Sequence, residues 1–274
     1  MRKPIPRKKN TFTKFIFHSK LFWGFMFLFL IFGLSYYKRN ALAYYFGFKS
    51  NKILKEEKKY ASRNAAVLAE NYDKVAGIDV SQYQGKINWN DVKFINKKNP
   101  IGFVFIRASV GNDCDDLSFK FNWKEAKKHK IIRGAYHYYR PNENSVEQAE
   151  RFIQLVKLEK GDLPPVLDIE KLPVEQSIDS LKIGLKRFLK KIDEHYKVKP
   201  IIYTNQKYYE DFLEEEFEDY TFWIANYNFI DQKIDDKFLF WQFTEKGKID
   251  GIRYNVDMNV YNGTPKMLDY LRIE

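Results

Sequence analysis

The stretch Leu163-Pro164-Pro165-Val166-Leu167-Asp168-Ile169-Glu170 joins an apolar run to two carboxylates that are separated by one residue. Side chains alternate between the two faces of an extended strand, so Asp168 and Glu170 point to the same face. Two acids this close raise the pKa of one of them, and general acid catalysis uses such a pair of a protonated acid and a carboxylate. The alternative is a strand that ends in a solvated acidic turn.

Runs rich in β-branched and aromatic residues recur from residue 73 onward, with helical patterns between them. We predict strands at Val75–Val80, Gly102–Ala108, Gly134–Tyr138, Pro165–Ile169, Pro200–Thr204, Thr221–Ala225, Phe238–Phe243 and Asp257–Val260. The predicted helices are Trp89–Asn99, Phe119–Lys130, Val146–Leu158, Val174–Tyr196 and Lys207–Phe217. This alternation favours an α/β fold with a parallel sheet and right-handed crossovers.

The connections after Ala225 are too short and too polar to hold full helices. The pattern is therefore five βα units followed by three strands. It fits a closed, TIM-like (β/α)5(β)3 barrel better than a doubly wound open sheet. The open sheet would need a Gly-rich phosphate turn after the first strand, and residues 79–85 do not form one.

The chain in front of this domain changes composition in steps. Residues 1–20 hold seven Lys/Arg and no acid, and Leu21–Tyr37 is an uncharged apolar run that is just long enough to span a bilayer. Basic residues before such a run favour a cytoplasmic N-terminus. A cleaved signal peptide with Ala41-Leu42-Ala43 at the cleavage site is the alternative. We predict a basic cytoplasmic segment (1–20), a transmembrane anchor (21–37), a juxtamembrane linker (38–72) with a charged helix at Lys52–Glu70, and a barrel domain (73–274) that is periplasmic or extracellular.

The net charge of +11 belongs to this leader. Residues 1–20 contribute seven positive charges, and residues 21–60 carry seven Lys/Arg against two acids, which leaves −1 for the rest of the chain. A domain with that balance is not expected to bind nucleic acid. Cys114 has no partner for an internal disulfide, and the histidines lack the spacing of metal ligands. We expect no metal, no cofactor and a monomer.

In barrels of this type the active site lies at the C-terminal ends of the strands. The residues at the predicted strand ends are rich in carboxylates and aromatic rings: Asp79, Arg107, Tyr136, His137, Tyr138, Asp168, Glu170, Tyr203, Asn205, Trp223, Asn226, Tyr227, Trp241, Gln242 and Asp257. Carboxylates transfer protons and stabilise cationic transition states, while aromatic rings stack on sugar faces. This combination predicts the hydrolysis of glycosides.

Six short motifs follow one another along residues 75–263. They are Gly77-Ile78-Asp79-Val80-Ser81-Gln82-Tyr83-Gln84-Gly85 with Asn88-Trp89, Gly134-Ala135-Tyr136-His137, Asp168-Ile169-Glu170, Trp223-Ile224-Ala225-Asn226-Tyr227, Phe240-Trp241-Gln242-Phe243-Thr244 and Val256-Asp257-Met258-Asn259. Together they resemble glycoside hydrolase family 25, the Chalaropsis-type lysozymes. The resemblance implies a (β/α)5(β)3 barrel that cleaves the β-1,4 bond between N-acetylmuramic acid and N-acetylglucosamine in the glycan strands of peptidoglycan.

The resemblance also implies roles for four acids. Glu170 would be the general acid, and Asp168 would orient the 2-acetamido group of the substrate as it closes on the anomeric carbon. Asp79 and Asp257 would support the acid electrostatically. The candidate sugar contacts, for which packing in the barrel is the alternative, are Tyr136, Tyr138, Tyr203, Trp223, Tyr227, Trp241 and Gln242.

The sequence departs from the family pattern at two positions, and two other functions are possible alternatives. Arg107 and Val110 stand where relatives often carry Lys and Glu, which affects the groove and leaves the acids unchanged. A non-catalytic wall-binding module would have no need for a paired carboxylate, yet all four acids are present. A chitinase-like enzyme would need further aspartates upstream on the strand, where Leu163 and Val166 stand.

Overall fold

The computed structural model describes residues 12–274, and it describes side chains throughout that range except at residues 12–21 and 40–48. The predicted basic segment 1–20 and the first residue of the predicted anchor, Leu21, therefore lie outside the described side chains. The chain divides into two compact units after Lys58. The sequence predicts a barrel domain from residue 73 onward, whereas the second compact unit begins at Lys59 and so also contains the end of a helix.

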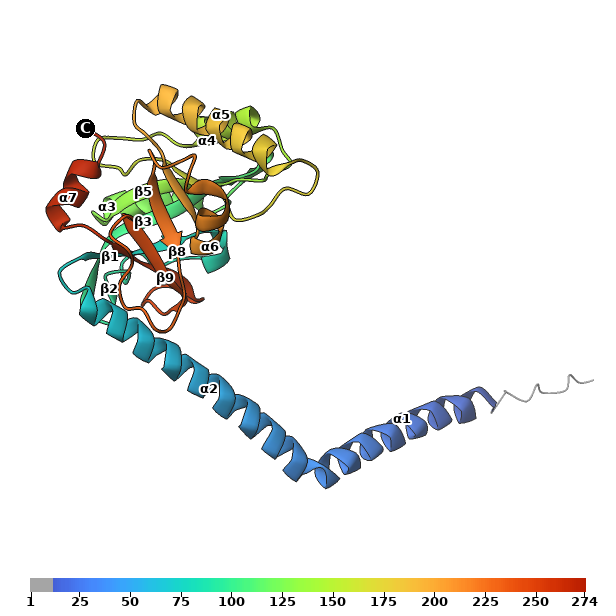
Figure 1. The fold of residues 1–274 in the computed structure, drawn as a ribbon. Helices are drawn as coiled ribbons and strands as arrows, with labels where there is room; N and C mark the ends of the chain where they lie inside the picture. Colours follow the sequence, from blue (N-terminus) through green and yellow to red (C-terminus); the bar gives the residue numbers. More distant parts are fainter. Residues whose placement is uncertain (1–11) are drawn as a thin grey trace, which may run out of the picture. The chain divides into compact units, whose positions relative to one another are not determined.

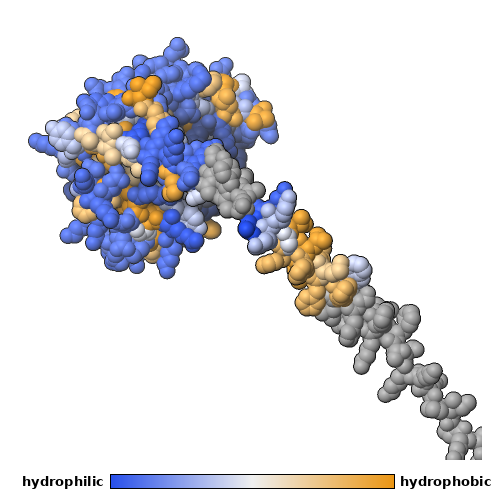
Figure 2. Space-filling view, turned by 90° about the horizontal axis from the view of Figure 1, so that it is seen from below, coloured by the Kyte–Doolittle hydropathy of each residue, from blue (hydrophilic) through white to orange (hydrophobic). Residues whose placement is uncertain are grey.

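The first unit is helical. It contains α1 (Phe12–Tyr37) and the first part of α2 (Arg39–Glu70). Most of the described side chains of α1 are apolar and exposed, and the Phe, Leu, Ile and Met side chains form the orange band in Figure 2. Among the residues that the structure describes, none of the helices combines the length and the apolar character that a membrane crossing requires.

The second unit is built on a closed barrel of eight strands (Figure 1). In chain order they are β1 (Val75–Val80), β3 (Asn99–Val110), β5 (Ile132–Tyr138), β6 (Val166–Asp168), β7 (Ile201–Asn205), β8 (Thr221–Ala225), β9 (Phe240–Gly247) and β10 (Val256–Tyr261). The sheet closes because β1 pairs with both β3 and β10. Two short strands, β2 (Phe94–Ile95) and β4 (Cys114–Asp115), pair with β3 in antiparallel fashion. The predicted barrel of mixed α/β type is confirmed.

The prediction of a parallel sheet is wrong for the last strand, β10. Seven barrel strands are parallel to one another, but β10 runs antiparallel to both β9 and β1. Parallel neighbours need a crossover of about a dozen residues or more, and the segment between Gly247 and Val256 is shorter than that. The chain therefore turns back on itself, and β10 closes the barrel in the opposite direction.

Helices cover the outside of the barrel at four crossovers. They are α3 (Phe119–Lys128), α4 (Ser145–Leu155), α5 (Ile178–Tyr196) and α6 (Gln206–Tyr208). Helix α6 continues as a π-helical turn (Tyr209–Leu213). A further helix, α7 (Pro265–Leu271), follows the last strand. The amphipathic pattern of α5 is confirmed, because Leu181, Leu185, Phe188, Leu189 and Ile192 are its buried residues.

The predicted helix at Trp89–Asn99 is wrong. The connection between β1 and β3, all of which is described, contains a short 3-10 helix (Gln82–Gln84), turns, and strand β2. Asn96 and Lys97 have φ angles of 51° and 59°, so the chain reverses there into a hairpin. The first crossover therefore lacks an α-helix, and five βα units with five helices overstate the helical content.

Aromatic rings fill the interior of the barrel. The ring of Phe105 stacks on Trp223 with centroids 4.4 Å apart, and Phe103 and Phe240 contact it edge-on. A Cβ atom on Gly77 would lie 2.4 Å from the ring of Phe103, so only glycine leaves enough room. Since the barrel is packed along its axis, a ligand site can form only at an end of it.

Gly77→Ala should destabilise the barrel by about 1–3 kcal/mol, because the added methyl group overpacks the ring of Phe103. Urea denaturation at 25 °C followed by tryptophan fluorescence measures the effect. In a Phe103→Leu background the same substitution should cost clearly less. An equal cost in both backgrounds would contradict the steric explanation.

Candidate active site

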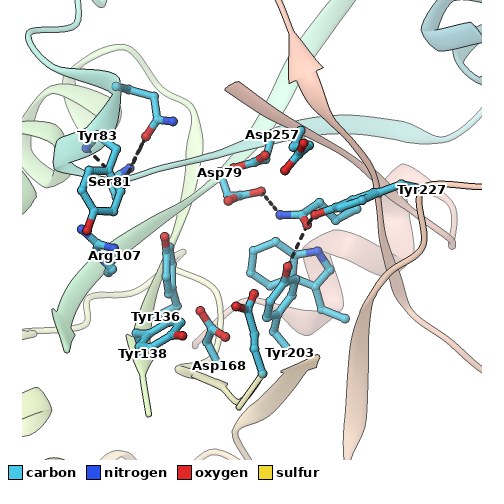
Figure 3. Close-up of a pocket in the computed structure, with 15 residues that line it drawn as sticks. Asp79, Ser81, Tyr83, Arg107, Tyr136, Tyr138, Asp168, Tyr203, Tyr227 and Asp257 are labelled. Carbon is cyan, nitrogen blue, oxygen red and sulfur yellow. Dashed lines mark hydrogen bonds between the residues drawn. The ribbon is translucent and has the colours of Figure 1, made fainter. Parts of the chain in front are cut away.

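A pocket of about 230 Å³ lies at the end of the barrel where the parallel strands finish. It is drawn in Figure 3 and is lined by Asp79, Ser81, Tyr83, Gln84, Arg107, Tyr136, Tyr138, Asp168, Glu170, Tyr203, Trp223, Tyr227, Gln242, Glu245 and Asp257. All four candidate acids line it, and so do all the candidate sugar contacts except Trp241. The structure thus brings together residues that are far apart in the sequence.

Strand order explains why the acids meet. Asp79 stands near the end of β1, Asp168 ends β6, and Glu170 follows two residues later. Asp257 is the second residue of β10, and it reaches the same rim only because β10 is antiparallel. Asp79 and Asp257 are direct partners in the β1–β10 register.

Asp79 and Asp257 form a hydrogen-bonded carboxyl pair. Burial raises the pKa of both groups, and in Asp257 the negative charge of Asp79 raises it further. Asp79 Oδ2 accepts hydrogen bonds from Gln242 Nε2 and Asn259 Nδ2, both at 2.8 Å, and these bonds hold its pKa down. Asp79 is therefore the ionised member of the pair, and Asp257 keeps its proton and donates a hydrogen bond to Asp79.

Asp168 is 4% exposed, and its Oδ1 has no hydrogen-bond donor among the described residues. Burial raises the pKa of Asp168 well above its ordinary value, and the charges of Glu170 and Asp79 add to this effect. Arg107 acts in the opposite direction. A buried acceptor without a donor is costly, so this oxygen is prepared for an N–H or O–H group from a ligand.

Glu170 is exposed as a residue at the rim, while its carboxyl group faces the pocket and lies within hydrogen-bond reach of the Tyr203 hydroxyl. Burial of the carboxyl raises the pKa of Glu170, and the nearby Tyr203 hydroxyl and the charge of Lys171 oppose the rise. Glu170 is thus accessible to a ligand, and it holds its proton to a higher pH than a carboxyl group in water does. These are the properties of a general acid.

Gln242 connects two tyrosines to this charged centre. Its Oε1 accepts hydrogen bonds from the hydroxyl of Tyr203 at 2.8 Å and from that of Tyr227, and its Nε2 donates to Asp79. Figure 3 shows Tyr203 and Tyr227 converging on this point, with Asp168 beside Tyr203. Because every polar atom of the amide is used in this way, its orientation is fixed and both hydroxyl groups are held at the pocket.

Trp241 was expected among the sugar contacts, but it lies elsewhere. It is 1% exposed, packs beside Phe243, and donates from Nε1 to the carbonyl oxygen of Asn226 at 2.9 Å. Side chains alternate along β9, so Gln242 points into the barrel while its two neighbours point outward. The prediction that Trp241 contacts the ligand in this pocket is therefore wrong.

Sequence reasoning did not assign a role to Tyr83, which is 71% exposed at the rim. The guanidinium group of Arg107 lies over its ring, 4.6 Å from the centroid. Buried Asp116 accepts from Arg107 Nε and from the backbone N–H of Gln82, each at 2.9 Å, and so fixes both the cation and the loop. The position of Tyr83 just after β1 is the signal that could have revealed it.

Nothing in the described part of the chain suggests a metal centre, since no three acidic, His or Cys side chains are placed to hold an ion there. His137 is fully buried, with its two ring nitrogens next to Ser109 Oγ at 2.8 Å and Gln148 Oε1 at 3.1 Å. It is a structural residue behind the barrel wall and does not line the pocket.

Comparison with known proteins bears on this pocket. The sequence profile of glycosyl hydrolases family 25 matches residues 78–252. The chain belongs to this family. It is therefore a glycoside hydrolase, and the family 25 barrel accounts for its fold.

The relatives of this family 25 enzyme include lysozymes. The uncharacterized protein YegX of Escherichia coli is 36% identical over 199 residues, which cover 71% of this chain and 72% of that protein. Lysozyme M1 of Streptomyces globisporus is 31% identical over 209 residues and covers 71% of this chain and 70% of its own. A family 25 glycosyl hydrolase from Bacillus anthracis superimposes with a TM-score of 0.65 at 28% identity, over 74% of this chain and 95% of that one.

Asp168→Asn should make this family 25 enzyme more stable at neutral pH. A raised pKa in the folded state means that stability is lost as the pH rises from the ordinary value of 3.8 through the folded pKa. The neutral amide removes that loss, and a gain of about 1 kcal/mol corresponds to roughly 2–4 °C in Tm for a domain of this size.

Thermal unfolding at pH 7 and at pH 3.5 measures this change. The gain should be present at pH 7 and absent at pH 3.5, where the wild-type carboxyl is protonated. Asp179→Asn on the exposed first turn of α5 is the matched control and should show no such gain. A Tm that falls equally at both pH values would argue against a buried, destabilising charge.

Proposed function

We propose that this enzyme is a muramidase that hydrolyses the β-1,4 bond between N-acetylmuramic acid and N-acetylglucosamine in peptidoglycan, with Glu170 as the general acid. The observation that carries the proposal is the placement of Glu170 beside Asp168 in one pocket of a family 25 barrel. The similarity to Lysozyme M1 supports the substrate class.

Glu170 would donate its proton to the oxygen of the scissile bond as the bond to the anomeric carbon breaks. The raised pKa of Glu170 lets it hold this proton to a higher pH than a carboxyl group in water does, and the exposure of the residue at the rim lets a long glycan reach it. After departure of the leaving sugar, the carboxylate would take a proton from the attacking water, which returns the acid to its starting state.

Asp168 would act on the 2-acetamido group of the bound sugar. Its Oδ1 lacks a donor in the described residues and is buried, so it can accept the N–H of the acetamido group and turn the carbonyl oxygen of that group toward the anomeric carbon. The carbonyl oxygen would then bond to that carbon while the glycosidic oxygen leaves with the proton of Glu170. The attacking water would later bond to the same carbon as the bond to the acetamido oxygen breaks.

The remaining charges favour the positive transition state. The pocket is lined by five carboxyl groups and a single cation, Arg107, which itself pairs with Asp116 outside that lining. Ionised Asp79 therefore adds negative potential close to the developing oxocarbenium ion. Tyr138 and Tyr227 are partly exposed at the pocket and are our candidates for contact with the sugar rings.

Glu170→Gln should leave a folded enzyme whose turnover of purified peptidoglycan falls by about 100-fold or more, because the amide keeps the shape of the side chain and has no acidic proton. Release of soluble reducing ends measures the rate, and circular dichroism checks the fold. Glu175→Gln, a few residues further on an exposed loop, is the matched control and should retain wild-type turnover. Near-wild-type activity of Glu170→Gln would refute the role of the acid.

A wall-binding module with no turnover is the competing function. Mass analysis of the sugar reducing ends released from peptidoglycan separates the possibilities in one experiment. N-acetylmuramic acid at the new reducing ends supports a muramidase, N-acetylglucosamine points to a glucosaminidase, and no release points to a binder.

We further propose that the apolar run Leu21–Tyr37 anchors the enzyme as a single-pass membrane protein, with the basic segment 1–20 in the cytoplasm, residues 38–72 as the juxtamembrane linker, and the catalytic domain on the outer side of the membrane. The exposed apolar side chains of α1 and the basic residues before it support this proposal. A tethered enzyme of this kind would act on glycan strands close to its own membrane.

The double substitution Phe29→Arg with Leu30→Arg should release the enzyme from the membrane fraction, since each charge at the centre of a span costs about 2.5–3.5 kcal/mol. Fractionation followed by immunoblotting measures the change. Tyr37→Arg, at the end of the run where the cost is small, should stay with the membrane. An enzyme that is soluble without any substitution would contradict the anchor.

A further inference from the structure

The end of α2 is attached to the loop that carries Tyr227. We call residues 59–71 the helix clamp and residues 226–233 the β8–β9 loop. Arg63 of the helix clamp donates from Nε at 2.8 Å and from Nη2 at 2.5 Å to the carbonyl oxygen of Asn228. Two charge-assisted hydrogen bonds to one carbonyl fix both the distance and the direction of the peptide next to Tyr227.

Other contacts also attach the helix clamp to the β8–β9 loop. Asn71 Nδ2 donates to the carbonyl oxygen of Gln232 at 2.7 Å, and the ring of Tyr60 lies 5.3 Å from that of Phe229. At the rim of this contact Lys233 pairs with Glu70 at 3.0 Å. The β8–β9 loop is thus held along its length by side chains that precede the barrel in the sequence.

Arg63 also reaches the barrel wall itself. Its Nη1 donates to the carbonyl oxygen of Phe243 at 2.5 Å, and Phe243 follows Gln242 in β9. The Arg63 side chain is largely buried, with the residue 8% exposed, so the two carbonyl groups would lose charged donors if it were removed. One guanidinium group therefore ties the loop to the strand.

Both attachment points are next to residues of the active site. The hydroxyl of Tyr227 donates to Gln242 Oε1, and Gln242 Nε2 donates to Asp79 Oδ2 at 2.8 Å. The two carbonyl groups that Arg63 holds therefore belong to the residues that directly follow Tyr227 and Gln242. A shift of either carbonyl group would move the tyrosine relative to the amide that it contacts.

We propose that Arg63 is a positioning residue of the active site, which sets the Tyr227 ring for substrate binding by tying the β8–β9 loop to β9. The helix clamp is then part of the catalytic domain, although the sequence assigns it to a linker. This inference rests on the proposed function of the pocket, because it takes Tyr227 as a contact of the bound glycan.

The test uses the full-length enzyme and compares Arg63→Lys with Arg187→Lys, a matched substitution on an exposed position of α5. Lysine keeps the charge but cannot bond both carbonyl groups in the geometry of a guanidinium. For soluble peptidoglycan fragments, Arg63→Lys should raise KM by about fivefold to tenfold with kcat within about twofold. Arg187→Lys should change neither constant.

A double-mutant cycle separates positioning from general loss of stability. Tyr227→Phe should raise KM by itself, and adding Arg63→Lys to it should raise KM little further, because both changes act through the same hydroxyl contact. Additive effects on KM, or an equal loss of kcat in Arg63→Lys, would overturn the proposal. Since a lysine variant keeps charge and volume, failure to fold is not expected, and thermal unfolding of each variant checks this.

Amide hydrogen exchange gives a readout that does not depend on the reaction. In Arg63→Lys, the amides of residues 226–233 should exchange at least about fivefold faster, while those of β5 and β6 should not change. Unchanged exchange rates in the β8–β9 loop would overturn the role of Arg63. Failure of the wild-type enzyme to cleave peptidoglycan would instead refute the proposed function, so the two failures are distinguishable.

Discussion

The antiparallel pairing of β10 with β1 is the contact on which the rest of the site depends. It closes the barrel, and in the same register it sets Asp257 opposite Asp79. Because β10 enters from the rim, its first residues and the last residues of the parallel strands share one end of the barrel. A parallel last strand would carry Asp257 toward the opposite end, and the carboxyl pair could not form.

Burial gives the gathered acids different tasks. All four have raised pKa values because the pocket withdraws them from water, but their partners differ. Asp79 has two amide donors and carries charge, whereas Asp168 has an oxygen with no donor among the described residues. Glu170 meets the solvent at the rim. Acid, orienting group and charged support thus follow from position in one pocket.

The filled barrel confines the site to one end, where the loops around it become important. Stacked aromatic rings occupy the axis, and one of them, Trp223, lines the pocket together with side chains from the strand ends and the loops that follow them. Asp116 fixes the loop of Tyr83 on one side, and the helix clamp holds the β8–β9 loop on the other. Loops are mobile unless they are tied down, and both ties use charged groups that are largely buried.

Local pattern in the sequence was enough to find β1 and β8 with their observed bounds, the amphipathic helix α5, and four of the five acids that line the pocket, because alternation and helical spacing are properties of neighbouring residues. Only the tertiary structure decided three other features: β10 is antiparallel, residues Trp89–Asn99 form no helix, and the side chain of Trp241 points out of the barrel. It also decided the helix clamp, in which Arg63 meets Phe243 across 180 positions of the chain. Contacts of that kind depend on how the barrel closes, and short-range patterns carry no information about closure.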